Sequence, residues 1–246
     1  MKAMVFAAGL GTRLRPITDR LPKALVPVCG KPLLDHVLSK LVAAGYDEIV
    51  VNVHHFPEQI RAYLATHDFG VPVRISDESS RLLETGGGIL HARELLLPLE
   101  EPFLVHNVDI VSNLDLGWFR SQTRPEALAT LLVSERPTRR YLLFDQQMRL
   151  MGWTDVSTGE VRSPYPDLHP DRCRRYAFAG IHNLSPAIFD AFAALGMPER
   201  FPIMDFYLQA CAEWRIEGVV ARELTLVDVG KIDTLTEAER ICQTLL

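Results

Sequence analysis

The sequence lacks several features that would assign it to a particular class of protein. No apolar run reaches the roughly 18 residues that a membrane-spanning helix needs, so we expect no membrane association. A basic excess is also missing, because 26 Lys and Arg stand against 31 Asp and Glu, for a net charge of −5. Proteins that bind nucleic acid use positive charge to neutralise phosphates, so this balance argues against a nucleic-acid partner.

Cysteine is scarce as well. The four cysteines are far apart, with no Cys-x-x-Cys pair, and they stand at Cys29, Cys173, Cys211 and Cys242. Such spacing disfavours a disulfide framework or a zinc site and predicts free thiols in a cytoplasmic protein.

What the chain does contain is an ordinary globular composition, with 246 residues and 48% hydrophobic side chains. Over residues 1–134, short apolar strands alternate with segments of helical periodicity. This pattern predicts an α/β fold with a Rossmann-like, mostly parallel mixed sheet and helices on both faces. Beyond residue 134 the pattern changes to a strand meander, a Pro-, Asp- and Arg-rich loop over 158–175, and further helices. We expect one domain over 1–246.

The expected elements are set by apolar periodicity and by Gly and Pro at their ends. The expected strands are 2–8, 48–53, 71–75, 102–106, 128–134, 141–144, 150–153, 176–183, 216–221 and 224–228. The expected helices are 33–44, 58–65, 88–96, 114–122, 186–194, 203–214 and 233–245.

The first 31 residues are basic and glycine-rich, with six Lys or Arg and only one acidic residue. Directly after the first expected strand comes Gly-Leu-Gly-Thr-Arg, ending at Arg13. Ligands of open α/β sheets bind beyond the carboxyl ends of strands, and glycines there let backbone N–H groups approach phosphate oxygens. Thr12 adds a hydroxyl, Arg13 adds a guanidinium, and Lys23 adds a second cation after Pro22. The segment therefore predicts a phosphate site.

Two common phosphate motifs do not fit this loop. No glycine is followed by Lys and then Ser or Thr, as the Walker A motif requires. The dinucleotide motif Gly-x-Gly-x-x-Gly fails because Leu14 stands at the third glycine position, which weakens an NAD-dependent oxidoreductase as an interpretation.

The segments GLGTRLRPIT, from Gly9, and PKALVP, from Pro22, together resemble the signature of the sugar-1-phosphate nucleotidylyltransferase family. In that family the loop and its Arg hold the nucleotide phosphates, and the Lys of the Pro-Lys pair lies against the reacting phosphates. The resemblance implies a nucleotide-binding half over 1–134, a sugar-binding half over 135–246, and catalytic roles for Arg13 and Lys23. The implied nucleotide-binding residues of this region are Ala8, Gly9, Gly11, Thr12, Arg13 and Lys23.

Two carboxylates are candidate ligands for Mg²⁺, the cofactor that the resemblance implies. Asp109 follows a buried-type strand, where a carboxylate facing a phosphate loop suits Mg²⁺. The family places a catalytic, metal-binding Asp there, usually after Gly, whereas this chain has Val108. Asp228 is the implied second ligand, in an Asp-x-Gly context before the last helix. Asp233 competes for that role, but it is better interpreted as a helix N-cap.

Glu84-Thr-Gly-Gly-Gly opens an expected helix, and three glycines there indicate a close backbone approach to a ligand. The resemblance implies that Thr85, Gly86 and Gly87 run past the nucleobase. This variant of the segment is similar to that of the N-acetylmuramate-1-phosphate uridylyltransferase branch of the family.

The sugar side is less defined. A glycine inside a strand often marks a close approach, and the resemblance implies sugar contacts at Glu84, Asn107, Gly180 and Asn183. Many members carry a Glu-Lys-Pro segment whose Lys binds the sugar phosphate, and we identify no match for it here. Substitutes could come from six arginines, namely Arg136, Arg139, Arg140, Arg172, Arg174 and Arg175.

The resemblance implies transfer of a nucleotidyl group from an NTP, with UTP favoured, to a sugar 1-phosphate such as N-acetylmuramate 1-phosphate. The products are an NDP-sugar and pyrophosphate. A guanylyltransferase for mannose or heptose 1-phosphate is the alternative within the family, and a non-catalytic nucleotide-sugar sensor is the alternative outside it. The expected partners are the NTP and the sugar 1-phosphate, with the chain as a monomer or homodimer.

Overall fold

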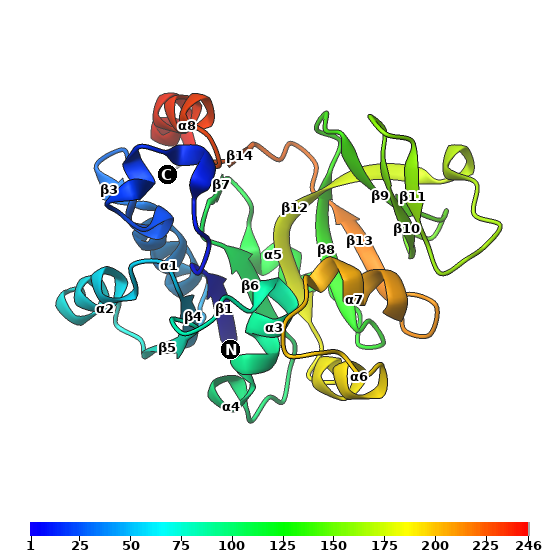
Figure 1. Ribbon diagram of the computed structural model, residues 1–246, viewed down its shortest axis with the longest axis horizontal. Helices are drawn as coiled ribbons and strands as arrows, with labels where there is room; N and C mark the ends of the chain where they lie inside the picture. Colours follow the sequence, from blue (N-terminus) through cyan, green and yellow to red (C-terminus); the bar gives the residue numbers. More distant parts are fainter. Residues whose placement is uncertain (246) are drawn as a thin grey trace.

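The computed structural model describes the backbone of residues 1–245 and the side chains of residues 1–240. A ten-stranded sheet runs along the long axis of the molecule (Figure 1). Its first four strands are parallel, in the order β5-β4-β1-β6. Their bounds are β1 Lys2–Phe6, β4 Glu48–Val53, β5 Val73–Asp77 and β6 Phe103–Asn107.

The long strand β12, Arg174–Leu184, connects this parallel part to the rest of the sheet. Its second half runs antiparallel to β6 on one side and to β8 on the other, and β13 adds parallel to β8. Its first residues pair with β9, from which β10 and β11 continue outward as an antiparallel meander. The bounds of these strands are β8 Ala129–Ser134, β9 Arg140–Phe144, β10 Leu150–Asp155, β11 Glu160–Arg162 and β13 Ile216–Val220.

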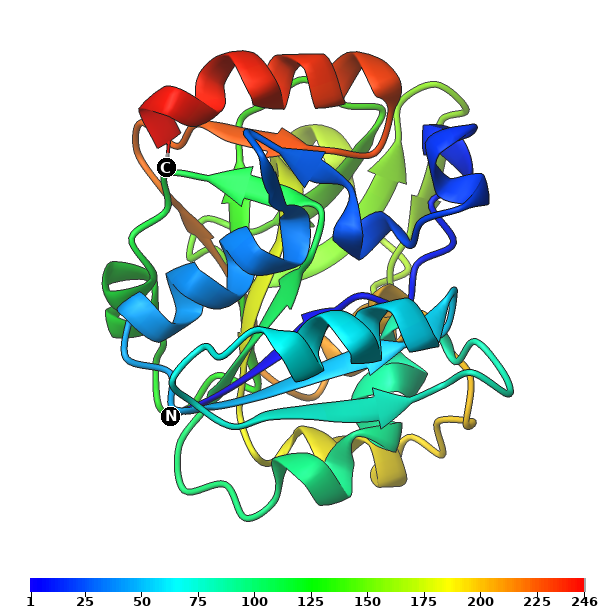
Figure 2. The same cartoon turned by 90° about the vertical axis from the view of Figure 1, so that its left-hand side faces the viewer.

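Helices cover both faces of the sheet because its strands alternate their side chains between two hydrophobic cores. Ala3 and Val5 of β1 enter one core, whereas Met4 enters the other. Figure 2 looks along the sheet from its β5 edge, with α1 and α8 (blue and red) above the parallel strands and α4 and α6 (green and yellow) below them. Helices that pack on the first core are α1 Leu33–Ala43, α2 Pro57–Thr66, α5 Leu116–Ser121 and α8 Ile232–Leu245. Helices that pack on the second core are α3 Glu84–His91, α4 Arg93–Leu96, α6 Ile188–Ala194 and α7 Ile203–Ala210.

Two short strand pairs lie outside the main sheet. One joins β2, Pro27–Val28, to β3, Lys31–Pro32. The other joins β7, Ile110–Ser112, antiparallel to β14, Leu226–Asp228, with Asp228 opposite Ile110. Helix α8 lies over both pairs (Figures 1 and 2). The second pair matters for function because it brings the chain after residue 225 beside the end of β6.

The predicted fold class is confirmed: the sheet is mixed and mostly parallel in its first half, with helices on both faces. The loop predicted over 158–175 is partly wrong, since β11 and the first residues of β12 lie within it. Neither segment has an apolar pattern of its own; β11 forms by pairing with β10, and the first residues of β12 form a strand by pairing with β9. The division at residue 134 into two functional halves stays a prediction.

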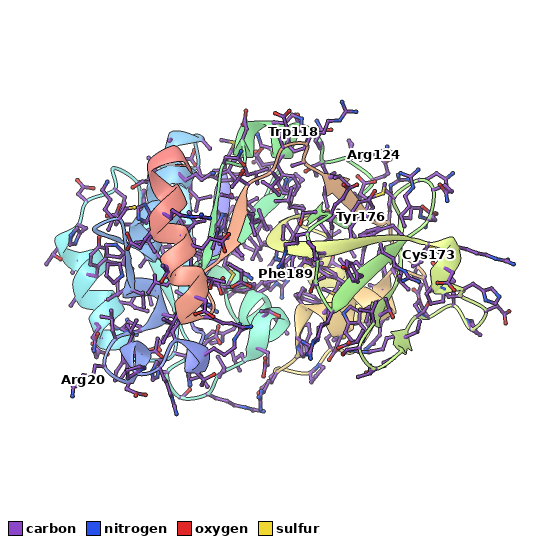
Figure 3. All side chains as sticks on the ribbon, turned by 90° about the horizontal axis from the view of Figure 1, so that it is seen from above. Arg20, Trp118, Arg124, Cys173, Tyr176 and Phe189 are labelled. Atoms are coloured by element: carbon purple, nitrogen blue, oxygen red, sulfur yellow. The ribbon has the colours of Figure 1, made fainter. Side chains whose placement is uncertain are left out.

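The expectation of four free thiols is wrong for one cysteine. Cys173 and Cys211 are free, whereas Cys29 is disulfide-bonded. The side chain of Cys242 lies outside the described residues. Seen from above, Cys173 and Arg20 lie toward opposite ends of the long axis (Figure 3). Along the described residues, no helix is long and apolar enough to cross a membrane.

Candidate functional site

A cavity of about 380 Å³, here called cavity 1, lies at the carboxyl ends of β1 and β6. The loop after β1 forms one wall, and the start of α3 and the end of β6 form others. Most of the residues expected to contact the nucleotide or the reacting phosphates, and two of those expected to contact the sugar, meet here. Those that line the cavity are Ala8, Gly9, Gly11, Thr12, Arg13, Lys23, Glu84, Thr85, Asn107 and Asp109.

A buried chain of hydrogen bonds holds the loop after β1 in place. The side-chain oxygen of Asn52, on β4, accepts hydrogen bonds from the backbone N–H groups of Ala7 (2.8 Å) and Ala8 (3.3 Å). The Asn52 amide donates to Glu78 Oε1 (2.7 Å), and Glu78 Oε2 accepts from Leu83 N (3.0 Å) just before α3. Sequence reasoning missed Asn52 and Glu78. Asn52 could have been noticed because it is the one amide side chain inside the apolar strand EIVVNV.

The two loop glycines have different roles. Gly11 has φ +63°, and a Cβ there would lie 2.7 Å from Thr18 Cγ2, so the chain's own packing requires glycine. Thr18 completes this turn by donating from its hydroxyl to Gly11 O (2.7 Å). Gly9, by contrast, has no heavy atom within 4 Å of the place where a Cβ would stand. Gly9 thus presents open backbone to the cavity.

Three charged groups converge at the inner end of cavity 1. The Lys23 ammonium pairs directly with Asp109 Oδ2, and both side chains are largely buried. The backbone N–H of Val229 donates to Asp109 O (2.8 Å), which fixes Asp228 close to Asp109. Burial and the neighbouring Asp109 carboxylate raise the pKa of Asp228, whereas Lys23 and Arg13 oppose that rise. Asp228 Oδ1 is buried and has no hydrogen-bond partner among the described residues.

Gly230 allows the approach of Arg13 to this group. A Cβ on Gly230 would stand 2.9 Å from Asp228 Oδ1 and 3.0 Å from Arg13 Nη2. The guanidinium of Arg13 and the carboxylate of Asp228 therefore lie on the same side of the chain at Gly230. Two carboxylates and two cations share one small volume.

A second cavity of about 870 Å³, here called cavity 2, adjoins the first. Both cavities are lined by Arg13 and Gly230, and Asp228 lines the second. Apart from Thr138 and Thr234, the remaining lining residues of cavity 2 fall into a cationic set and an apolar set. The cationic set is Arg136, Arg139, Arg140 and Lys231, and the apolar set is Leu142, Trp153, Phe178 and Met204.

Comparison with known proteins identifies the family of the chain. The sequence model of a family described as nucleotidyl transferase matches residues 2–160, well over half of the chain. The chain belongs to the nucleotidyl transferase family. One relative, an N-acetylmuramate alpha-1-phosphate uridylyltransferase of Neisseria meningitidis, is 32% identical over 98% of both chains. Another protein of that name, from Caulobacter vibrioides, is 53% identical over 112 residues, which are 44% of this chain and 46% of the relative.

A solved structure described as UDP-glucose pyrophosphorylase complexed with UDP-glucose shares the fold. It superposes with a TM-score of 0.76 at 18% sequence identity and covers 99% of this chain and 98% of its own. At that identity the likeness concerns the architecture of this nucleotidyl transferase alone.

The glycine run of α3 is explained by the packing of this nucleotidyl transferase itself. A Cβ on Gly86 would meet the Phe201 ring at 2.2 Å, and one on Gly87 would meet Glu199 O at 2.3 Å. Both glycine N–H groups donate to Phe201 O, at 2.9 and 3.1 Å. The close approach therefore comes from the protein's own segment before α7, and neither glycine lines cavity 1. Thr85 does line it, while its hydroxyl accepts from Ile203 N (2.8 Å).

The predicted sugar contacts separate into near and distant ones. Gly180, with φ +75°, sits in a bulge of β12, and a Cβ there would stand 2.8 Å from Asn107 Nδ2. Gly180 therefore positions Asn107 rather than facing either cavity itself. Asn183 lines neither cavity, is 3% exposed and donates to Thr123 Oγ1 (2.8 Å), so its contact with the sugar stays a prediction. It pairs with Leu104, toward the opposite end of β6 from the site.

The structure also reduces the choice among the six arginines. Arg136, Arg139 and Arg140 line cavity 2, whereas the other three lie outside it. Arg136 donates to Phe178 O (3.1 Å) and is near enough to Asp228 to oppose the rise of its pKa. Sequence reasoning missed that Glu135-Arg136-Pro137 has the form of the absent Glu-Lys-Pro segment, with Arg in place of Lys. Because Arg136 stands where the family segment has Lys, a search for Glu-Lys-Pro did not find this segment.

Proposed function

We propose that this nucleotidyl transferase moves the nucleotidyl group of an NTP, with UTP preferred, onto a sugar 1-phosphate. One observation carries this proposal: a phosphate-loop cavity and a wider cationic cavity meet at Arg13 and Gly230, beside Asp228. Two phosphorylated substrates held in these cavities would bring their phosphates together at the shared residues. The meeting of two cavities favours group transfer over the simple binding expected of a nucleotide-sugar sensor.

The chemistry suits the residues present. A phosphate monoester has a second pKa near 6, so at neutral pH it is already a nucleophile and needs no general base. In the proposed step its oxygen forms a bond to the α-phosphorus of the NTP, the bond from the α-phosphorus to the bridging oxygen breaks, and pyrophosphate leaves. Arg13 would stabilise the departing charge, and Lys23 would neutralise the α-phosphate and the attacking phosphate.

Asp109 and Asp228 fit a divalent cation, which we propose is Mg²⁺. The buried, unpartnered Asp228 Oδ1 and the neighbouring Asp109 carboxylate are oxygen ligands of the kind that Mg²⁺ takes. Among the described residues no group of three or more His, Cys, Asp or Glu forms a complete metal site. A site of two carboxylates completed by water and substrate phosphates is common for this ion. When bound, Mg²⁺ would neutralise charge on the nucleotide phosphates.

For the sugar we propose N-acetylmuramate 1-phosphate, with UTP as the nucleotide. The Neisseria relative, aligned over almost its whole length, is named for that reaction. Cavity 2 also offers aromatic surface from Trp153 and Phe178, against which the apolar face of a sugar ring can pack.

The test is a grid of four NTPs against several sugar 1-phosphates, with pyrophosphate release as the signal. We expect the strongest signal from UTP with N-acetylmuramate 1-phosphate. A strongest signal from GTP with mannose or heptose 1-phosphate would replace the proposal with the guanylyltransferase. Absence of pyrophosphate in every combination, with nucleotide binding retained, would show a sensor. Lys31→Ala, which changes an exposed lysine outside both cavities, is a control that should leave the grid unchanged.

A further inference from the structure

Cavity 2 carries more positive charge than a sugar phosphate uses. Among the described residues that line it, five are cationic and only Asp228 is anionic. A bound phosphate monoester brings about two negative charges. Arg13 already faces the nucleotide cavity, and Arg136 and Lys231 lie close to Asp228 and Gly230, at the reaction end. A surplus of cationic side chains therefore remains at Arg139 and Arg140.

These two neighbouring arginines are not equivalent. Arg140 Nε lies 3.6 Å from Asp155 Oδ2, so its charge is partly balanced by the protein itself. The Arg139 side chain is exposed and, among the described residues, makes no hydrogen bond or ion pair, although its charge helps to lower the pKa of Asp155. Of these two neighbours, Arg139 is thus the one whose guanidinium is more available to a ligand.

The backbone at Arg139 is nevertheless held firmly. Arg139 O accepts from Val156 N (2.8 Å), at the end of β10. On either side, Thr138 N donates to the Tyr141 hydroxyl (3.0 Å) and Arg140 N donates to Thr138 Oγ1 (3.3 Å). A side chain that starts from an ordered turn loses less freedom when it binds, so this arginine is prepared for recognition.

The same cavity also has an apolar lining. Leu142, Trp153, Phe178 and Met204 line it together with the arginines. A ligand that matches this lining has a phosphate, a ring with apolar faces and a second anionic group. A carboxylate suits the second position because a guanidinium binds it through two parallel hydrogen bonds.

We propose that Arg139 pairs with a carboxylate on the sugar and so selects acidic sugar 1-phosphates over neutral ones. This inference rests on the proposed function and adds a specificity-determining residue to it. N-acetylmuramate carries such a carboxylate on the lactyl ether at its O3, whereas N-acetylglucosamine is otherwise the same sugar with a free hydroxyl there. The methyl ester of N-acetylmuramate keeps the shape of the lactyl group and removes its charge.

The experiment measures kcat/KM with UTP for three substrates, the 1-phosphates of N-acetylmuramate, its methyl ester and N-acetylglucosamine. For the unaltered protein we expect the charged substrate to exceed both neutral ones by about tenfold to a hundredfold, the range of a hydrogen bond between charged groups. Arg139→Gln should reduce this ratio to near one, and Arg139→Lys should restore part of it, since Lys keeps the charge without the planar fork. Arg175→Gln, on an exposed arginine paired with Asp171 outside cavity 2, should keep the ratio.

Two results would overturn the inference while leaving the proposed function in place. One is equal turnover of the charged and neutral substrates by the unaltered protein. The other is an Arg139→Gln variant that loses the same factor on all three substrates, which would mean a general electrostatic or structural role. Absence of pyrophosphate with every sugar 1-phosphate would instead reject the proposed function itself.

Discussion

Replacement of Gly86 by alanine tests whether the glycine run serves the fold or a ligand. The new Cβ would lie 2.2 Å from Phe201 Cε2 and 2.4 Å from Cδ2, so the ring must move by more than about 1 Å to reach an ordinary carbon contact. Phe201 is 3% exposed and packs edge-on against Phe192, with ring centroids 5.2 Å apart, which leaves it little room.

The size of the effect follows from two opposing contributions. Overpacking of a tight core costs about 3 kcal/mol at the upper end of its usual range. Alanine within a helix recovers about 1 kcal/mol relative to glycine. The clash therefore wins, and Gly86→Ala should destabilise the protein by about 2 kcal/mol, which lowers Tm by about 4–8 °C for a chain of this size.

Thermal unfolding followed by circular dichroism measures this shift, with Gly9→Ala as the matched control. Because no atom lies within 4 Å of the corresponding Cβ at Gly9, its Tm should stay within about 2 °C of the unaltered protein. The methyl group enters cavity 1 instead, so KM for the NTP should rise. An unchanged Tm for Gly86→Ala together with a loss of NTP affinity would refute the reasoning, because the glycine would then serve the ligand.

Three further predictions concern the charged and buried groups. Lys23→Ala removes the cation paired with Asp109 and should lower kcat by at least about a hundredfold, measured as pyrophosphate release; a kcat within tenfold of normal would exclude a role for this cation. Asp228→Asn should abolish turnover yet raise Tm at neutral pH, because a carboxyl whose pKa is raised on folding destabilises the folded state above that pKa. This gain in Tm should shrink as the pH falls through the pKa of Asp228 in the folded protein. Burial lowers the pKa of His106 to about 4 and that of His182 to about 3. As the pH falls, both imidazoles are therefore protonated near pH 6.5 in the unfolded chain but stay neutral in the folded protein. Urea titrations should therefore show a free energy of unfolding that is highest above pH 6.5 and falls toward pH 4, and a flat profile would contradict this.

Several parts of the fold were predictable because their cause is local. The strand over 48–53 and the helix that begins at Leu33 match the structure closely, since each has a clear apolar period and a marked end. Strand β7 was missed, because three residues have too little pattern of their own and are ordered by pairing with β14. The start of α3 was predicted too late in the chain, at residue 88 rather than Glu84, because glycines at 86–88 normally disfavour a helix. In the folded protein this part of the helix is stabilised by packing against α7 and the segment before it.

The amino-acid sequence by itself determined the class of sheet and the composition of the phosphate loop. Alternating apolar periods, left-handed glycine turns and a proline before Lys23 are all properties of a few consecutive residues. Only the tertiary structure decided which distant groups meet. Pairing of β7 with β14 sets Asp228 beside Asp109, more than a hundred residues earlier in the chain, and the approach of Phe201 explains Gly86. Such contacts depend on which surfaces the packed chain brings together, and no local pattern encodes the partner.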